Sequence, residues 1–198
     1  MNPYFDVNHI AGLLLLFTSS AWGMMELSQR SNVPQAREGA TRIGNHGFRI
    51  AVVLCLAATT AALYLVPHIA PAAAIRPGAV AFAVGMVILL AGLVLRGWSF
   101  KALGDYFTHT VMVSPDQPVI AKGPYRVLRH PSYTGILLAS VGVGLAAANW
   151  IALAAATLFT LALLLYRVHV EERALLTTLG ERYQTYAAQH KRLVPLVW

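Results

Sequence analysis

Long apolar runs alternate with short polar connections along this chain. Residues 9–28, 48–66 and 78–98 are almost free of charge, and two more apolar runs cover residues 132–149 and 150–168. An α-helix rises by roughly 1.5 Å per residue, so about 20 residues cross the ~30 Å hydrocarbon core of a bilayer. The pattern therefore predicts an all-α fold, a polytopic membrane helical bundle with about five transmembrane helices.

The connections predict how these helices are arranged. Only Ala148, Asn149 and Trp150 separate the last two apolar runs, and so short a link predicts an antiparallel helical hairpin. The first run is predicted to be a helix and not a signal peptide, because Asp6 and His9 stand where a basic region would be needed. The charged stretch over residues 169–191 has a helical pattern and predicts a tail helix after the hairpin.

Charge shows which side of the membrane each connection occupies. The chain is 57% hydrophobic and only 12% charged, whereas ordinary soluble domains have about 25% charged residues. With five spans, every lysine and arginine except Arg76 falls on the side of loops 29–47 and 99–131 and of the C-terminal tail. The positive-inside rule makes that side cytoplasmic and puts the N-terminus on the opposite side. The net charge of +7 then reflects topology, and no nucleic acid partner is expected.

Several kinds of chemistry find no support in the sequence. Cys55 is the single cysteine, which excludes a disulfide framework. The histidines show no metal-ligand spacing, so no metal site is expected, and neither a phosphate-binding loop nor a Ser–His–Asp arrangement is present. The Gly142-Val143-Gly144 stretch lies in mid-span and predicts close helix packing. The oligomeric state stays open.

The densest polar cluster lies where the chain enters its fourth span, around Arg129-His130-Pro131. Proline suits the first turn of a helix, and free N–H groups with the positive end of the helix dipole follow it. With the Arg129 cation, this boundary would suit a carboxylate. The alternative is that Arg126 and Arg129 only anchor the span at phospholipid headgroups.

A second cluster, Glu171-Glu172, follows the fifth span by a few residues. Glu171 lies four residues after Arg167 and can pair with it along a helix. Glu172 points about a hundred degrees further round that helix. For one of the two acids a solvated helix face is the expected interpretation. Glu26, at the cytoplasmic end of the first span, is a costly place for a carboxylate and either pairs with a loop arginine or contacts substrate.

Two weaker features border these clusters. An apolar and aromatic stripe at helical spacing continues into the tail, and Gly180 is expected to break or kink that helix. The stripe consists of Leu175, Leu179, Tyr183 and Tyr186. Residues 103–107, after the third span, are expected to form a turn beside the same pocket.

Together the two clusters resemble a known superfamily. The first motif is Gly123-Pro124-Tyr125, Arg129-His130-Pro131-Ser132-Tyr133 and Gly135, and the second is Glu171-Glu172, Leu175, Gly180, Tyr183 and Tyr186. In this order they resemble the isoprenylcysteine carboxyl methyltransferase and phospholipid N-methyltransferase superfamily of small membrane enzymes. The match covers roughly residues 85–195 of the sequence. It implies one membrane domain over residues 1–198, with N-terminal helices over 1–77 and a methyltransferase-like region over 78–198.

The resemblance also implies a cofactor, S-adenosylmethionine, with S-adenosylhomocysteine as product. It implies a cofactor site made of Tyr125, His130, Pro131, Tyr133, Glu171, Glu172 and Tyr183. Arg129 and Glu172 become the expected catalytic residues, and Arg129 and Glu26 the expected substrate contacts. Leu179 departs from the pattern, because the family usually has an aromatic residue before the glycine, and the ending at residues 191–195 follows it loosely.

The acceptor is expected to be a membrane lipid or another lipophilic molecule, reached through a lateral opening between helices. An isoprenylcysteine-like carboxylate, a phospholipid amine, a thiol and a quinone-like lipid all remain open. A carboxylate or thiolate needs no general base, whereas an amine would have to lose a proton, to Glu172 or His130. Two other functions stay open: an NADPH-dependent membrane reductase of the sterol-reductase type, and a non-catalytic membrane scaffold.

Overall fold

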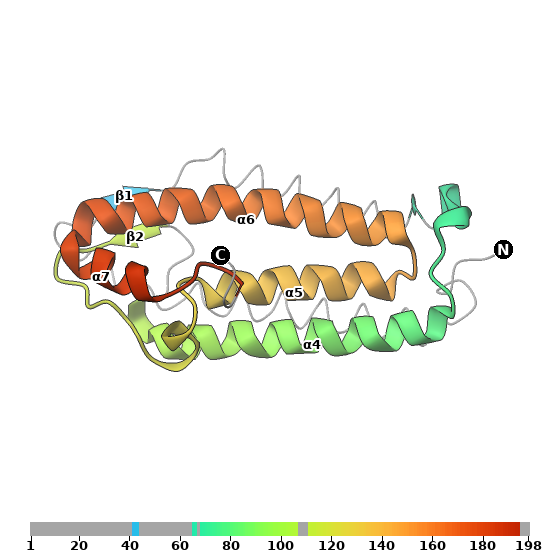
Figure 1. Ribbon diagram of the computed structural model, residues 1–198, viewed down its shortest axis with the longest axis horizontal. Helices are drawn as coiled ribbons and strands as arrows, with labels where there is room; N and C mark the ends of the chain where they lie inside the picture. Colours follow the sequence, from blue (N-terminus) through green and yellow to red (C-terminus); the bar gives the residue numbers. More distant parts are fainter. Residues whose placement is uncertain (1–40, 44–64, 67, 107–110, 195–198) are drawn as a thin grey trace.

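Three long helices lie side by side and form the body of the molecule (Figure 1). The computed structural model describes residues 41–43, 65–66, 68–106 and 111–194 of the 198-residue chain. The bundle helices are α4 (Gly78–Leu103), α5 (Pro131–Ala146) and α6 (Trp150–Leu179), and the shorter α7 (Glu181–Gln189) follows them. The predicted first span and nearly all of the second lie outside the described residues.

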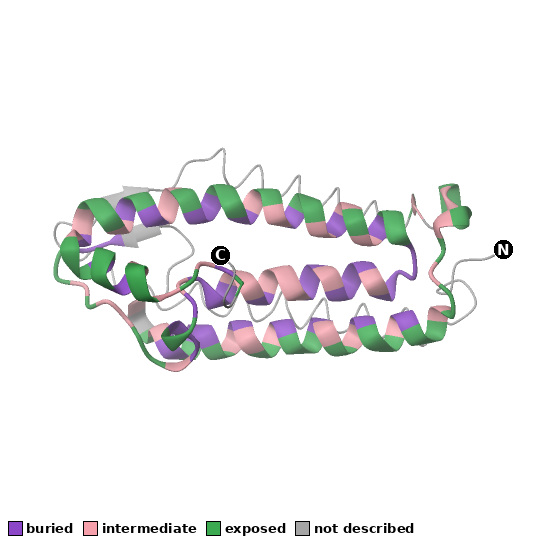
Figure 2. Cartoon of the chain, in the orientation of Figure 1, coloured by how far each residue is buried: buried purple, intermediate pink, exposed green. Residues whose placement is uncertain are grey.

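Two of these helices are long and apolar enough to cross a membrane. They are α4, with 26 residues, and α6, with 30. Both leave many of their apolar residues exposed (Figure 2), such as Val87 at 66% and Val94 at 70% exposure on α4. A helix that is apolar on all sides and still uncovered suits a lipid environment better than a water-facing surface.

The fourth predicted span is shorter than the sequence suggested. α5 ends at Ala146 after 16 residues, because Ala147 to Asn149 form the turn into α6. Ala148 adopts a positive φ of 50° within this turn. The Asn149 side chain then caps α6 by accepting from the Ile151 and Ala152 N–H groups. The predicted antiparallel hairpin is confirmed, and residues 169–179 continue α6 instead of starting a separate tail helix.

α4 and α5 pack with their backbones in close contact. A Cβ atom added to Gly92 would lie 2.6 Å from Ala139 N and Gly135 O, and one added to Gly85 would lie 2.5 Å from Ala146 N. Gly142 packs equally closely against α4, as its mid-span position predicted. Small residues at a helix interface allow this close approach. The resulting van der Waals contacts stabilise the helix pair in lipid, where there is no hydrophobic driving force between helices.

Residues 70–75 lie beside the hairpin turn, where the Ile75 N–H donates to the Ala148 carbonyl and Asn149 Nδ2 donates to the Ala70 carbonyl. The opposite end of the bundle carries further irregular structure. Here β1 (Thr41–Ile43) pairs antiparallel with β2 (Val111–Val113), and a 3-10 turn covers Gly123–Arg126. The all-α prediction missed this two-stranded sheet because three-residue strands are too short to show an alternating pattern. α7 turns back beside the same end (Figure 1), since the chain reverses at Gly180, whose φ is 55°. The predicted break at Gly180 is confirmed.

Candidate functional site

The loop before α5 and the segment after α6 meet at this end of the bundle. The Tyr186 hydroxyl on α7 donates to the carbonyl oxygens of Tyr125, at 2.8 Å, and Leu128, at 3.2 Å. The Arg129 N–H donates to the Lys191 carbonyl at 2.7 Å. Hydrogen bonds to backbone carbonyls therefore join residues about 60 positions apart, and both sequence motifs belong to one site.

The two segments enclose a cavity with about 870 Å³ of empty space, including the part that opens outward. Its walls come from the end of α4, the loop before α5, the first turn of α5, the last turns of α6, and α7. The residues that line it are Leu103, Tyr106, Val113, Gln117, Pro118, Val119, Ile120, Tyr125, Arg129, His130, Ser132, Tyr133, Arg167, Glu171, Leu175, Leu179, Tyr183 and Tyr186. The predicted turn after the third span borders the cavity through Leu103 and Tyr106.

One polar group of the cavity wall is a chain of three side chains. The Tyr133 hydroxyl on α5 donates to Glu171 Oε2 at 2.6 Å and accepts from Arg167 Nε at 3.2 Å. Arg167 is buried, with 6% exposure. The sequence predicted a pairing of Glu171 with Arg167 along α6, and the fold brings the α5 hydroxyl between them. This fixes the Tyr133 ring against α6.

A second polar group is centred on Glu172. Its Oε1 accepts from Arg129 Nη1 at 2.6 Å and lies 3.3 Å from His130 Nε2, while Oε2 accepts from Arg192 Nε at 2.9 Å. The His130 ring stacks on Tyr133, with ring centroids 5.6 Å apart. Glu172 thus joins α6, the loop before α5 and the C-terminal segment, and its carboxylate is fully engaged by these partners.

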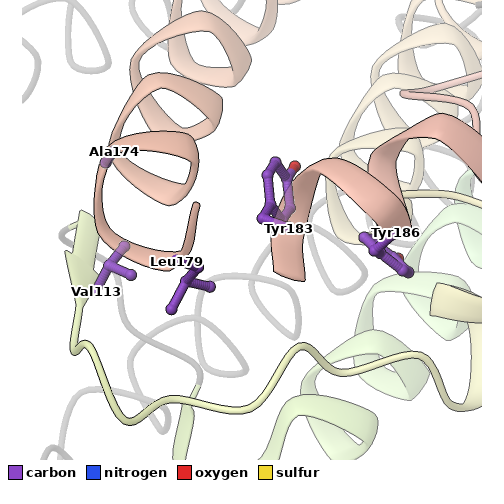
Figure 3. Packing of buried hydrophobic residues seen from close by; sticks show 5 residues of the cluster. All are labelled: Val113, Ala174, Leu179, Tyr183 and Tyr186. Carbon is purple, nitrogen blue, oxygen red and sulfur yellow. The ribbon is translucent and has the colours of Figure 1, made fainter. Parts of the chain in front are cut away.

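The tail stripe forms the apolar wall. Figure 3 shows Val113, Ala174, Leu179, Tyr183 and Tyr186 packed as one buried cluster, with β2, α6 and α7 all contributing. The stripe had been expected to pack mainly on the protein and only secondarily on a ligand. The packing on the protein is observed in this cluster, and the four residues of the stripe also line the cavity.

Two buried polar atoms of the cavity wall lack a partner among the described residues. They are the Tyr183 hydroxyl and Arg129 Nε. Burial, and after it the Glu172 charge, raises the pKa of Tyr183 well above its usual value, so this hydroxyl stays protonated and can donate. Unsatisfied buried donors cost free energy, so a ligand with oxygen acceptors would complete this wall. S-adenosylmethionine, with a carboxylate and ribose hydroxyls, fits that requirement.

Most of the predicted site residues come together around the cavity. Tyr125, Arg129, His130, Tyr133, Glu171 and Tyr183 all line it. Glu172 and Pro131 do not belong to the lining: Glu172 lies among its three cationic and histidine partners, and Pro131 is buried at the first position of α5. Glu26 lies outside the described residues.

The sequence assigned no role to Ser132 or Arg96, which lie near the site. Ser132 lines the cavity, and Arg96 on α4 is buried and donates to Ser132. Ser132 had been quoted only as part of the motif. An arginine near the end of an otherwise apolar span was the available signal for Arg96.

Two apolar helices long enough to cross a membrane and a polar-walled cavity at one end of their bundle make this cavity the candidate functional site. Residues 83–177 match the isoprenylcysteine carboxyl methyltransferase (ICMT) family. Protein-S-isoprenylcysteine O-methyltransferase B of Arabidopsis thaliana is 30% identical over 115 residues, 57% of this chain and 58% of that protein. The Xenopus laevis protein-S-isoprenylcysteine O-methyltransferase is 32% identical over 114 residues, 57% of this chain and 38% of its own length.

A solved structure agrees with these sequence matches. The eukaryotic intramembrane Ras methyltransferase ICMT superposes with a TM-score of 0.61 and 26% identity, over 78% of this chain and 55% of that one. Residues 83–177, just under half of the chain, are therefore similar to the isoprenylcysteine carboxyl methyltransferase family, and the long apolar helices agree with the likeness to an intramembrane protein. It spans only about half of the length of several relatives. The uncharacterized protein YpbQ of Bacillus subtilis, 27% identical over 88 residues, is similar as well.

Proposed function

We propose that this protein is an S-adenosylmethionine-dependent methyltransferase that acts on a lipophilic acceptor. The observation that carries the proposal is the cavity in which the two motifs meet, at the end of helices that are long and apolar enough to cross a membrane. Such a position gives a water-soluble cofactor access from the aqueous side and a lipid access from the bilayer. The similarity of residues 83–177 to the isoprenylcysteine carboxyl methyltransferase family supports the same reaction class.

The cofactor would supply an electrophilic methyl group on a sulfonium. Tyr125, His130, Tyr133 and Tyr183 offer aromatic faces that suit a cation, and Glu171 offers the carboxylate of the cavity wall. The unpartnered donors on Tyr183 and Arg129 suit the oxygen atoms of the cofactor or of an acceptor carboxylate. Pro131 would contribute by starting α5 where it does.

Glu172 has a different proposed role from the one that the sequence suggested. Because its oxygens are engaged by Arg129, His130 and Arg192, it would hold the first two residues against the cavity instead of contacting the ligand itself. Methyl transfer is an in-line displacement, so alignment and exclusion of water account for most of what the protein must do. Firm placement of Arg129 and His130 would help both to align the reactants and to exclude water.

The acceptor would enter from the bilayer and meet the apolar part of the wall at Val119, Ile120 and Leu175. The concentration of basic residues at this end of the bundle supports a cytoplasmic site, with the N-terminus on the opposite side. We infer one membrane domain for the whole chain, with the site in its C-terminal part. Glu26 remains a proposed substrate contact.

The test compares ligands on the purified protein in detergent. S-adenosylhomocysteine should raise the melting temperature, because a ligand that binds only the folded state stabilises it. Labelled S-adenosylmethionine incubated with a total lipid extract should then yield a labelled lipophilic product, and Arg129→Ala should abolish it. Stabilisation by NADPH alone would favour a membrane reductase. Stabilisation by neither ligand, with no transfer, would contradict an enzymatic role.

A further inference from the structure

Arg96 is a buried cation in an apolar helix. It lies in the last third of α4, with 6% of its surface exposed. An arginine within a membrane helix is costly unless its charge is well accommodated, and such residues commonly serve function. An arginine that merely anchors a helix at phospholipid headgroups would extend outward into water. Arg96 does the opposite, since it is enclosed by its neighbours.

Its partners lie in the first turn of α5. Arg96 Nη1 donates to Ser132 Oγ at 2.7 Å and to the Ser132 carbonyl oxygen at 3.2 Å. Its guanidinium carbon also lies 4.6 Å from the centroid of the Phe100 ring on α4. A charged donor that reaches both the side chain and the backbone of one residue fixes that residue in place and in rotation. The ring beneath it restricts the guanidinium in turn.

Close helix packing makes this contact possible. A Cβ atom on Gly135, one turn further along α5, would lie 3.0 Å from Arg96 Cβ. The absent side chain therefore lets α4 approach where Arg96 crosses to α5. On the other side of the same turn, Arg167 of α6 donates to the Tyr133 hydroxyl. Buried arginines from α4 and α6 thus hold two successive residues of α5.

We propose that Arg96 is a positioning residue for the cofactor site, acting through Ser132 on the first turn of α5. Ser132 and Tyr133 line the cavity and His130 precedes them, so a shift or rotation of this turn moves three wall residues at once. Arg96 is not among the residues that line the cavity, so its hydrogen bonds act on a ligand through Ser132 of α5. This inference rests on the proposed function, because the ligand is S-adenosylhomocysteine.

The experiment separates positioning from general stability. Arg96→Met removes both hydrogen bonds, Arg96→Lys keeps the charge without the planar fork, and Ser132→Ala removes one bond. Leu89→Ala is the matched control, because Leu89 is fully buried in the same α4–α5 interface, away from this turn. S-adenosylhomocysteine affinity is measured by calorimetry. Amide hydrogen exchange of the ligand-free protein is followed over residues 132–135.

Arg96→Met should weaken S-adenosylhomocysteine binding about tenfold or more, as expected for loss of charge-assisted hydrogen bonds. It should also speed exchange in the first turn of α5, with Arg96→Lys intermediate. Leu89→Ala should lower the melting temperature but leave affinity within about twofold. Equal affinity losses in Arg96→Met and Leu89→Ala, or unchanged exchange in Arg96→Met, would overturn the proposal. Absence of binding by the wild-type protein would instead contradict the proposed function.

Discussion

Arg129 and Glu172, 43 positions apart in the sequence, form an ion pair with 2.6 Å between Nη1 and Oε1. Arg129 belongs to the loop before α5 and Glu172 to the last turns of α6. Both side chains are largely buried, with 15% and 8% exposure. This contact joins the two motifs that the sequence presents separately, and it orients an arginine of the cavity wall.

Replacing Glu172 should destabilise the protein through that pair. Glu172→Gln removes the charge that Arg129 and Arg192 share and should cost roughly 2 kcal/mol of unfolding free energy, typical of charged hydrogen bonds in a buried setting. Reversible unfolding in mixed detergent micelles, followed by circular dichroism, measures it. Arg192→Gln is the control: its side chain is 36% exposed, so its loss should cost below ~1 kcal/mol. Equal losses in the two variants would contradict this account.

The Tyr183 hydroxyl should matter for ligand binding and little for folding. Because this hydroxyl has no hydrogen-bond partner among the described residues, Tyr183→Phe removes no internal hydrogen bond there and should leave the melting temperature equal or slightly higher. S-adenosylhomocysteine affinity should fall about five- to tenfold if the ligand accepts from this hydroxyl. Tyr186→Phe makes a matched comparison, since that hydroxyl donates to two backbone carbonyls and its loss should lower stability. The opposite ranking of the two variants would refute the assignment.

Alkaline pH should reveal the buried tyrosines. Burial raises the pKa of Tyr125, Tyr183 and Tyr186 above the usual value of about 10, with Glu171 adding to the effect at Tyr125 and Glu172 at Tyr183. The neutral hydroxyls therefore contribute stability fully below pH ~10 and lose it as pH rises further. Tyrosinate absorbance should show part of the eight tyrosines ionising only upon unfolding. A titration complete in the folded protein near pH 10 would exclude this.

The glycine contacts between α4 and α5 should tolerate no side chain. Gly92→Ala places a Cβ atom 2.6 Å from backbone atoms of α5 and should cost about 2 kcal/mol by overpacking. The same unfolding assay applies. Leu90→Ala, at a side chain that is 47% exposed on α4, provides a control expected to change stability little. If Gly92→Ala were as stable as the parent, the close approach of the two helices would be wrong.

Apolar patterning located α4 and the spanning part of α6 from sequence, because both are longer than any turn and carry almost no charge. It placed the end of the fourth span too late, since Ala147 and Ala148 are apolar and only their backbone conformation marks them as a turn. The pairing of β1 with β2 could not be predicted from the sequence, for a related reason. Hydropathy registers runs of residues, and these features depend on local backbone geometry and on partners far along the chain.

The motifs named half of the residues that line the cavity, since these residues occur in recognisable order along the chain. The motifs did not show which of the two adjacent acids lines the cavity and which one pairs with Arg129. Spacing places Glu171 and Glu172 on different sides of a helix, but it does not show which side meets the cavity. Only the packing of α6 on α5 brings Glu171 to Tyr133 and Glu172 to Arg129. In the same way, the contact of the Arg96 side chain with α5 depends on the glycines that let α4 approach α5 closely.

The sequence by itself determined that this protein belongs in a membrane and which two segments hold its polar chemistry, because hydropathy and residue type are local properties. The tertiary structure decided that these segments meet around one cavity, that Glu171 faces it, and that Arg96 and Arg167 hold the first turn of α5. Such relationships depend on distances between helices. Those distances are set by side-chain volume at each crossing, and no single stretch of sequence contains them.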